Sequence, residues 1–377
     1  MKYQYDYRLP EHVKYLTRQL ATVTTGPWRI MEVCGGQTHS ILRYGIDRLI
    51  PSSIELIHGP GCPVCVTPAE KIDLAIAIAG SPRTILCSYG DMLRVPGSWE
   101  SLLSAKAKGA VVRIVYSPME ALELARENPD YQVVFFAVGF ETTAPANAMT
   151  IYQAEQLNVK NYSMLVAQVL IVPAMKYLLQ SAECQIQGFL AAGHVCSITG
   201  LKSYHKLAEE FKIPLVVTGF EPVDIILGIT ACIKQLEEGR TEVENQYPRS
   251  VQSTGNQYAL DLLEQVYEVV DMDWRGLGSI KDGAYQLREK YRDFDAEEKY
   301  QNSINHSFAR KIPVCQADKV LCGQMKPWQC PYFAKDCRPQ NPLGAPMVSA
   351  EGACAAYYFY RDGLQLSLGG ENGTVVR

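Results

Sequence analysis

The sequence predicts an α/β protein with two related lobes, each built on a parallel sheet, followed by a C-terminal region that is cysteine-rich and mainly helical. Three observations lead to this prediction. Short β-branched and apolar runs alternate with helical patterns from about residue 28 to residue 229. A short strand–turn–helix motif occurs twice within that stretch. After residue 293 the chain becomes richer in Cys, Pro and Gly.

The predicted strands are apolar runs that helical patterns separate from one another. Strands are expected at residues 30–33, 54–57, 84–87, 111–116, 133–138, 164–171, 188–192 and 215–217. The helical patterns include residues 69–79, 102–107, 118–126 and 204–211. Continuous apolar strands followed by helices are typical of parallel sheets that are covered on both faces. This stretch is therefore predicted to be of the α/β class.

Two similar turns indicate that the lobes are related. Gly139-Phe140-Glu141-Thr142 follows one predicted strand and Gly219-Phe220-Glu221-Pro222 follows another, and both lead into helices that begin near a proline. A chance recurrence of a Gly-Phe-Glu turn is the alternative. We expect a first α/β lobe at residues 1–140, a second at 141–245 and a third region at 246–377. The third region is expected to open with a helical stretch at residues 251–270.

The composition is that of an ordinary globular protein. The chain has 377 residues, 47% of them apolar and 20% charged, with a net charge of −4. Because the lysines and arginines are scattered, we predict no nucleic-acid surface and no membrane surface. The N-terminal residues lack the apolar core of a secretory signal, and the longest apolar stretch, around residues 164–175, is too short to span a bilayer. A cytoplasmic location is therefore predicted.

Twelve cysteines are present. In a reducing compartment, many cysteines indicate metal ligation or redox chemistry more often than structural disulfides. Some are nevertheless expected to be inert. Cys87, Cys184 and Cys232 lie in largely apolar stretches of sequence, so we expect them to behave as small buried hydrophobic residues.

The first group of residues that could carry chemistry is Cys34-Gly35-Gly36-Gln37-Thr38-His39. Cys34 falls at the carboxyl end of a predicted strand, which is where open α/β sheets bind ligands. A helix is expected to begin near Thr38, and its N-terminus should lower the pKa of the Cys34 thiol. His39 can supply an imidazole to the same metal or to the thiol. Taken alone, such a pair is equally compatible with a structural role.

The second constellation is the Cys62-x-x-Cys65 pair within Gly59-Pro60-Gly61-Cys62-Pro63-Val64-Cys65. It follows a predicted strand and precedes a capping box, so it lies on a turn before a helix N-terminus. That context favours reversible dithiol–disulfide chemistry or iron chemistry. Half of a zinc knuckle and purely structural cysteines are the alternatives. The sequence contains no second closely spaced Cys-x-x-Cys.

The third constellation is a set of five cysteines near the C-terminus. Four thiolates gathered by loops suit a [4Fe–4S] cluster, since each iron takes one protein sulfur. Zinc also accepts four cysteines, but wide and uneven spacing favours the cluster. Five cysteines for four places leave Cys315 or Cys322 as the first ligand. The set is Cys315, Cys322, Cys330, Cys337 and Cys354.

Two further turns lie at the ends of predicted strands. Residues 139–145 bring the Glu141 carboxylate and hydroxyl groups to a helix start, and residues 193–198 offer His194 and Cys196. Each turn is either a functional site or a simple helix cap. The sequence contains no P-loop, no Gly-x-Ser-x-Gly elbow and no Gly-x-Gly-x-x-Gly motif.

Together these motifs resemble those of the HypD family of [NiFe]-hydrogenase maturation proteins. The resemblance rests on residues 34–39, 59–65, 139–145 and 347–357 and runs essentially from end to end. It implies two α/β lobes and a third region that carries a [4Fe–4S] cluster. It also implies assembly of an Fe(CN)2CO moiety together with a HypC-type small chaperone and a HypE-type cyanide donor, indirectly for the hydrogenase large subunit.

The resemblance also implies roles for individual residues. Cys34 would hold the iron that receives CN and CO, with His39 close by. Cys62 and Cys65 would form a redox-active pair between that site and the cluster. The chain would then be an assembly scaffold with redox activity more than a conventional turnover enzyme.

The resemblance implies the cluster ligands as well, with two departures from the family pattern. Many relatives have Cys where this chain has Pro346, so that position is not a ligand here. Around residues 315–323 the alignment favours Cys315, although Cys322 could substitute. Glu351 matches a glutamate beside the last ligand. The remaining matching ligands are Cys330, Cys337 and Cys354.

A rival hypothesis from the same residues is a cluster-coupled protein disulfide reductase. It uses the Cys62–Cys65 pair and the cluster, but it gives Cys34 and His39 no metal. A structural zinc protein is the third possibility, and it would be colourless when purified.

Overall fold

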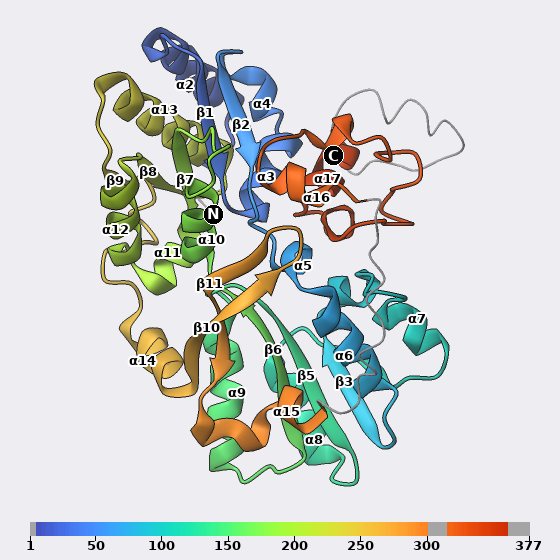
Figure 1. Ribbon diagram of the computed structural model, residues 1–377. Coiled ribbons are helices and arrows are strands. Elements are labelled where there is room, and N and C mark those ends of the chain that lie inside the picture. Colours follow the sequence, from blue (N-terminus) through green and yellow to red (C-terminus); the bar gives the residue numbers. More distant parts are fainter. Residues whose placement is uncertain (1–4, 301–314, 361–377) are drawn as a thin grey trace.

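The computed structural model describes residues 5–300 and 315–360 (Figure 1). Two parallel-stranded sheets with helices on their faces form two lobes, here called lobe A and lobe B. The C-terminal residues 315–360, here called the Cys-rich region, lie beside lobe A. The predicted α/β class with two parallel-sheet lobes is therefore confirmed. The predicted third region, 246–377, lies partly outside the described residues.

Lobe A contains a sheet whose strands are all parallel, in the order β2-β1-β7-β8-β9. Helices cover both faces, because successive strand residues point to opposite sides. On β7, for example, Leu190 packs with α2 and α13, whereas Phe189 packs with α10 and α12. The strands are β1 (Trp28–Glu32), β2 (Ile54–His58), β7 (Gly188–Ala192), β8 (Leu215–Thr218) and β9 (Val243–Asn245). The helices are α2 (Pro10–Val23), α3 (Gly35–Arg43), α4 (Ile46–Leu49), α10 (Ile171–Leu179), α11 (Gly193–Thr199), α12 (Lys202–Phe211) and α13 (Pro222–Glu238).

Lobe B contains a sheet in the order β10-β11-β6-β5-β3-β4, in which β3 to β6 are parallel and β10 and β11 form an antiparallel hairpin. On β5, Phe135 packs with α8 and α9, and Phe136 packs with α6 and α7. The strands are β3 (Thr84–Ser88), β4 (Val112–Ile114), β5 (Gln132–Gly139), β6 (Tyr162–Val169), β10 (Tyr267–Trp274) and β11 (Gly278–Leu287). The helices are α5 (Pro63–Val66), α6 (Ala69–Ala79), η1 (Gly90–Arg94), α7 (Leu102–Ala107), α8 (Pro118–Glu127), α9 (Ala144–Gln156), α14 (Gln257–Val266), η2 (Glu289–Phe294) and α15 (Ala296–Tyr300).

The Cys-rich region consists of turns and short helices that pack on both lobes. Its last helix, α17, packs on α3 of lobe A, and Tyr357 shares a small core with Leu42. Ala345 and Val348 belong to a core of lobe B. Its helices are α16 (Ala317–Leu321), η4 (Pro327–Gln329), η5 (Ala345–Met347) and α17 (Ala353–Tyr360).

All eight predicted strands are present, but the boundary predicted near residue 140 does not separate the lobes. Strands β5 and β6, which flank that boundary, are parallel neighbours in lobe B, and β1 and β2 belong to lobe A with β7, β8 and β9. Each lobe is thus assembled from distant stretches of chain. Pairing of strands more than a hundred residues apart leaves no local signal in the sequence.

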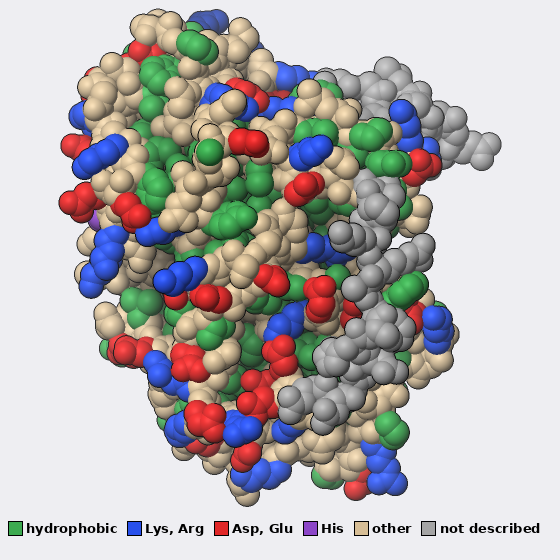
Figure 2. All heavy atoms as spheres, in the orientation of Figure 1, with side chains coloured by type: hydrophobic (Ala, Val, Ile, Leu, Met, Phe, Trp, Pro, Cys, Tyr) green, Lys and Arg blue, Asp and Glu red, His purple; other side chains and the backbone are tan. Residues whose placement is uncertain are grey.

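The helix predicted at residues 251–270 is shorter than expected. It spans Gln257–Val266, and the hairpin of β10 and β11 follows. The β10 strand alternates between more and less exposed residues, with Asp271 and Asp273 exposed. Acidic side chains gather on this face of the hairpin (Figure 2). No helix in the described parts of the chain is long and apolar enough to cross a membrane.

Candidate metal and thiol redox site

A cleft of about 920 Å3 lies where the carboxyl ends of strands from both sheets meet. The lobe A residues that line it follow β1, β2, β7 and β8 in the chain. The lobe B residues follow β3, β4 and β5, and Glu351 comes from the Cys-rich region. Lobe A contributes Cys34, His39, Cys62, His194 and Phe220, and lobe B contributes Asp91, Tyr116, Phe140 and Thr143.

The sheet topology explains why Cys34 lies at the base of this cleft. In lobe A the chain leaves β1 for β2 on one side, and β7 pairs on the other side of β1. The carboxyl ends of β1 and β7 therefore form a topological switch point, which is where open α/β sheets bind ligands. Cys34 follows β1 and His194 follows β7, so the fold brings together two residues that are 160 positions apart.

The thiol of Cys34 is buried and lies beside the imidazole of His194. Its Sγ is 3.9 Å from Nδ1 and 4.0 Å from Nε2 of that ring. The helix predicted to begin near Thr38 begins earlier, at Gly35, with Cys34 as its N-cap residue. Burial raises the pKa of the Cys34 thiol well above the ordinary value. Backbone N–H groups of Gln37 and Gly36 lower the pKa, yet burial outweighs them. The expectation of a thiol with a lowered pKa is thus wrong for the metal-free site, because the sequence does not reveal burial.

Burial shifts the pKa of the neighbouring His194 in the opposite direction, because it favours the neutral form of both side chains. It lowers the pKa of this imidazole to about 4, so the ring is neutral near pH 7. The Phe220 ring packs against it with a centroid separation of 5.0 Å and an edge-on orientation. A neutral imidazole is the form that binds metals. Sequence reasoning included His194 only as one of two open possibilities, since its approach to Cys34 depends on the pairing of β1 with β7.

His39 lies at the rim of the cleft and contacts the Cys-rich region. Its Nδ1 is 3.4 Å from the Ala350 carbonyl oxygen, and its Nε2 is 3.4 Å from the Tyr360 hydroxyl. Glu351 is nearby: burial raises the pKa of its carboxyl and the charge of His39 opposes that rise. The structure therefore places His39 and Glu351 on the face where the Cys-rich region covers α3.

A buried carboxylate that sequence reasoning did not single out holds the Cys34 backbone in place. Glu32 is fully buried and accepts hydrogen bonds from the Cys34 backbone N–H at 2.8 Å and from the Thr38 hydroxyl. It also lies 2.7 Å from His58 Nδ1, whose Nε2 is 3.0 Å from the Tyr357 hydroxyl. This network joins β1, β2 and α17. The signal in the sequence that could have identified Glu32 is a charged residue within an otherwise apolar strand.

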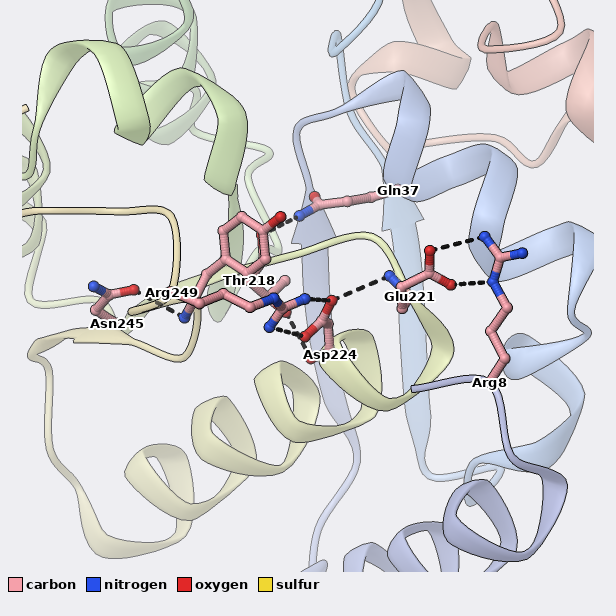
Figure 3. Close-up of polar contacts among 8 residues, drawn as sticks. Arg8, Gln37, Thr218, Glu221, Asp224, Asn245 and Arg249 are labelled. Atoms are coloured by element: carbon pink, nitrogen blue, oxygen red, sulfur yellow. Dashed lines mark hydrogen bonds and ion pairs between the residues drawn. The ribbon is translucent and has the colours of Figure 1, made fainter. Parts of the chain in front are cut away.

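Gln37 fastens α3 to the strands behind the site (Figure 3). Its side-chain amide donates to the carbonyl oxygens of Ala191 and Thr218, both at 3.3 Å. On the far side of Thr218, the Arg249 guanidinium forms a two-pronged ion pair with Asp224, at 2.8 and 2.5 Å. The conformation of the Cys34 turn is therefore fixed by side chains from several elements.

The Cys62–Cys65 pair runs from the cleft into the protein. Cys62 caps α5 and lines the cleft, whereas Cys65 is buried behind it. Burial and a hydrogen bond with the Cys62 side chain raise the pKa of the Cys65 thiol, and the neighbouring Cys354 adds to this. The Cys65 Sγ lies 3.8 Å from the Ala345 carbonyl oxygen, so Cys65 lies between the cleft-facing Cys62 and the Cys-rich region.

Four of the five C-terminal cysteines line one small cavity, which we call the four-cysteine cavity. Its thiols influence one another: burial first, and then the charges of the other three, raise the pKa of Cys354. Gly344 makes room for them, because a Cβ there would lie 2.0 Å from Cys315 Sγ. Cys322 lines a different cavity, with Cys184. The four cysteines are Cys315, Cys330, Cys337 and Cys354.

These four thiols line one cavity. Among residues 5–300 and 315–360, no three His, Cys, Asp or Glu side chains are arranged to hold one metal ion. A tetrahedral zinc site needs such an arrangement, whereas a [4Fe–4S] cluster binds one cysteine at each iron and separates the four. Four cysteine thiols around one cavity provide the donor set that a [4Fe–4S] cluster takes, one sulfur for each iron.

Buried thiols dominate this site, which places the chain in the class of two-lobed α/β proteins suited to metal or thiol chemistry. The family model for HypD, described as "Hydrogenase formation hypA family", matches residues 11–361. The "Hydrogenase maturation factor HypD" of Escherichia coli (strain K12) is 44% identical over 96% of this chain and 98% of its own length. The "Hydrogenase expression/formation protein HupD" of Azotobacter chroococcum mcd 1 is 45% identical over 96% and 97%. The chain therefore belongs to the HypD family of hydrogenase maturation factors.

Proposed function

We propose that this protein is the scaffold on which the Fe(CN)2CO moiety of a [NiFe]-hydrogenase is assembled. The observation that carries the proposal is the pair of Cys34 and His194, 3.9 Å apart at the base of an open cleft. Thiolate sulfur and neutral imidazole are both good ligands for ferrous iron. Two protein ligands would leave other positions on the iron substrate for CN, CO and a group from a partner protein.

The chemistry of the Cys34 site supports iron binding that is coupled to the release of a proton from the Cys34 thiol. Burial keeps the Cys34 thiol protonated in the metal-free protein, and a metal binds the thiolate. Iron binding at this position therefore releases one proton, and loading improves as the pH rises. His194 requires no deprotonation near neutral pH, because its pKa is already about 4.

The size and openness of the cleft support work with other maturation proteins. A volume of about 920 Å3 is far more than an iron ion with diatomic ligands needs. Tyr116, at its rim on the lobe B side, is 89% exposed. We propose that a HypC-type chaperone enters the cleft and completes the iron coordination, and that a HypE-type donor supplies cyanide there.

The Cys62–Cys65 pair is proposed to be the redox element beside this site. Closing its disulfide releases two electrons and two protons, and reducing it takes up the same number. A [4Fe–4S] cluster held by the four-cysteine cavity would supply single electrons when bound. Cys65 is the residue of this pair that contacts the Cys-rich region, through the Ala345 carbonyl oxygen 3.8 Å from its Sγ.

Infrared spectroscopy of the anaerobically purified chain with its small chaperone tests the proposal. Iron-bound CN and CO absorb in a window where protein is silent, and we expect bands there. Cys34→Ala and His194→Ala should abolish the bands or reduce them at least tenfold, while Cys87→Ala, which changes a buried lobe B cysteine, should keep them.

The rival function, a cluster-coupled protein disulfide reductase, predicts a different result. It gives a brown protein without bands in that window whose disulfide turnover is unaffected by Cys34→Ala and is lost in Cys62→Ser. Bands that persist in Cys34→Ala would rule out Cys34 as the iron anchor.

A further inference from the structure

Cys322 was one of two possible first ligands of the cluster, but it lies outside the four-cysteine cavity. It lines a separate cavity of about 320 Å3 together with Cys184. Both cysteines are partly exposed and free. Cys184 was expected to be inert and buried with Cys87 and Cys232, but only the latter two are fully buried. The structure thus brings together two accessible thiols that neither the cleft nor the four-cysteine cavity uses.

The two segments that carry these thiols are held face to face by hydrogen bonds. Glu183, the residue before Cys184, accepts from the Gln324 side chain at 2.8 Å. Arg29 on β1 reaches both segments: its guanidinium donates to the Gly323 carbonyl oxygen at 3.2 Å and also to the Gln185 side chain. The immediate neighbours of each cysteine are therefore linked to the segment opposite.

The turn that presents Cys322 fits closely against lobe A. Gly323 has a positive φ of 74°, and a Cβ there would lie 2.5 Å from the Ile57 side chain. Lys326 then donates to the Leu56 carbonyl oxygen at 2.6 Å and pairs with Glu55 at 3.1 Å. These contacts hold the segment against the edge strand β2. The position of Cys322 opposite Cys184 is therefore fixed by its flanking residues.

The surroundings of Cys322 are negatively charged. Burial, and after it the charges of Asp318, Cys184 and Glu183, raise the pKa of Cys322 to about 11. Lys319, on the same short helix as Asp318, is in its last turn. The shared cavity and the hydrogen bonds between the flanking residues place the two cysteines beside each other.

We propose that Cys184 and Cys322 are a second oxidisable thiol pair, which a low-molecular-weight disulfide converts into a disulfide clip between lobe A and the Cys-rich region. In the first step one cysteine thiolate attacks the small disulfide, which forms a mixed disulfide and releases one small thiol. In the second step the other cysteine attacks the mixed disulfide and releases the second small thiol. The two protein thiols are oxidised, one small disulfide is reduced to two thiols, and the two protein-bound protons end on those thiols.

The clip would act on the part of the molecule that has the least regular structure. It joins the segment after α10 to the segment after α16, so it would tie the Cys-rich region to lobe A. The inference is independent of the proposed function, because it involves neither the cleft nor bound iron.

Peptide mapping after oxidation tests the inference. The full chain, purified anaerobically, is incubated with oxidised glutathione, alkylated and digested with trypsin. We expect a linked species that joins the peptides 177–202 and 320–335, with fragment ions that assign the link to Cys184 and Cys322. Its yield should fall at least tenfold in Cys184→Ser and in Cys322→Ser, and it should be unchanged in Cys232→Ser, which alters a fully buried cysteine.

A second measurement keeps the inference falsifiable if a variant folds poorly. Limited proteolysis of the oxidised wild-type chain should cut the Cys-rich region at least severalfold more slowly than in the reduced chain, and a reductant should reverse the protection. The inference is overturned if glutathione oxidises Cys62–Cys65 but yields no link between Cys184 and Cys322. A link that persists in Cys184→Ser overturns it as well.

Discussion

The Cys34 site and the four-cysteine cavity both gather thiols, but the protein builds them in opposite ways. Cys34 is fixed by regular structure: its backbone N–H donates to Glu32 at 2.8 Å, and the next N–H donates to the Gly61 carbonyl oxygen at 2.8 Å. The four-cysteine cavity is formed by turns and short helices. The residues that hold Cys34 and place His194 beside it therefore lie on or directly after regular strands of lobe A.

The four-cysteine cavity has features of a site whose folding depends on the metal group that it binds. Between Cys330 and Cys337 the chain makes a tight turn in which Ala334 has a positive φ of 59°, an unfavourable backbone conformation for a residue with a Cβ. Local bonds hold this turn, such as Cys337 N–H to the Tyr332 carbonyl oxygen at 3.0 Å. A bound metal group contributes its binding free energy to the folding of its ligands. The comparison predicts that losing the metal disorders only the Cys-rich region.

The largest expected effect separates the two sites by metal content. Cys354→Ala removes one of the four thiols of the cavity and should abolish the cluster, so cluster iron, sulfide and visible absorption should fall to background. The Cys-rich region should then become sensitive to protease, while the far-ultraviolet circular dichroism of the lobes persists. Cys34→Ala should keep the cluster and lose only the iron that carries CN and CO. A cluster lost equally in both variants would contradict the comparison.

Two glycines allow a matched test of rigid against adaptable surroundings. A Cβ at Gly61 would lie 2.2 Å from the Cys34 backbone nitrogen, and a Cβ at Gly344 would lie 2.0 Å from Cys315 Sγ. Gly61→Ala meets backbone that cannot move without disturbing β1, so we expect it to destabilise the fold by about 3 kcal/mol or more. Gly344→Ala meets a side chain that can turn away, so it should impair cluster binding with little effect on unfolding.

Urea unfolding together with iron analysis of both variants checks this pair. Equal loss of folding stability in Gly61→Ala and Gly344→Ala would show that the four-cysteine cavity is as rigid as the Cys34 site. Loss of the cluster in Gly344→Ala without loss of stability would sharpen the distinction.

The parts of this comparison that were predictable from the sequence are local. The predicted strands are short apolar runs, and Cys34 and Cys62 follow two of them, so their place after strand ends was correctly predicted. The alternation in β10 was not recognised, because the regular pattern of α14 runs directly into it. Its charged residues also resemble those of an exposed helix face.

What could not be predicted depends on pairing and burial. The pairing of Glu32 with Leu190 brings His194 to Cys34, and no property of residues near position 34 indicates a partner 160 residues away. The assignment of Cys322 depends in the same way on the packing of its turn against β2. Burial of Cys34 reverses the predicted direction of its pKa shift.

A pH-dependent prediction applies to the preformed part of the molecule. Glu141 is buried, its Oε1 accepts the Ile171 N–H at 3.0 Å, and burial raises its pKa to about 7 from 4.5. Between those values the folded chain keeps a proton that the unfolded chain has lost, so stability falls as the pH rises. The shift corresponds to about 3 kcal/mol between pH 4.5 and pH 8.

Glu141→Gln should remove this dependence, because glutamine does not ionise. Urea unfolding at both pH values should show the variant gaining about 3 kcal/mol on the wild type as the pH rises, with cluster content unchanged. Glu123→Gln, at an exposed residue of α8 paired with Arg126, is the control and should follow the wild type. A parallel pH dependence of Glu141→Gln and wild type would show that this carboxyl ionises normally.

The smallest expected effect concerns Arg249, which supports the Cys34 site from behind (Figure 3). Its guanidinium lies 4.3 Å from the ring centroids of both Tyr7 and Tyr247 and pairs with the buried Asp224. A lysine keeps the charge but cannot form the two-pronged pair and stack on both rings at once. Arg249→Lys should therefore cost about 1–2 kcal/mol of folding stability.

The informative result for Arg249→Lys is which of the two sites responds to this small loss of stability. Tyr247 packs edge-on against Phe220, with centroids 6.3 Å apart, and Phe220 packs against His194. A loosened Arg249 should therefore broaden or shift the infrared bands of iron-bound CN and CO while leaving the cluster absorption unchanged. If the cluster absorption changed and the bands did not, lobe A would not be the rigid support of the Cys34 site, and the contrast between a preformed site and a cofactor-dependent one would fail.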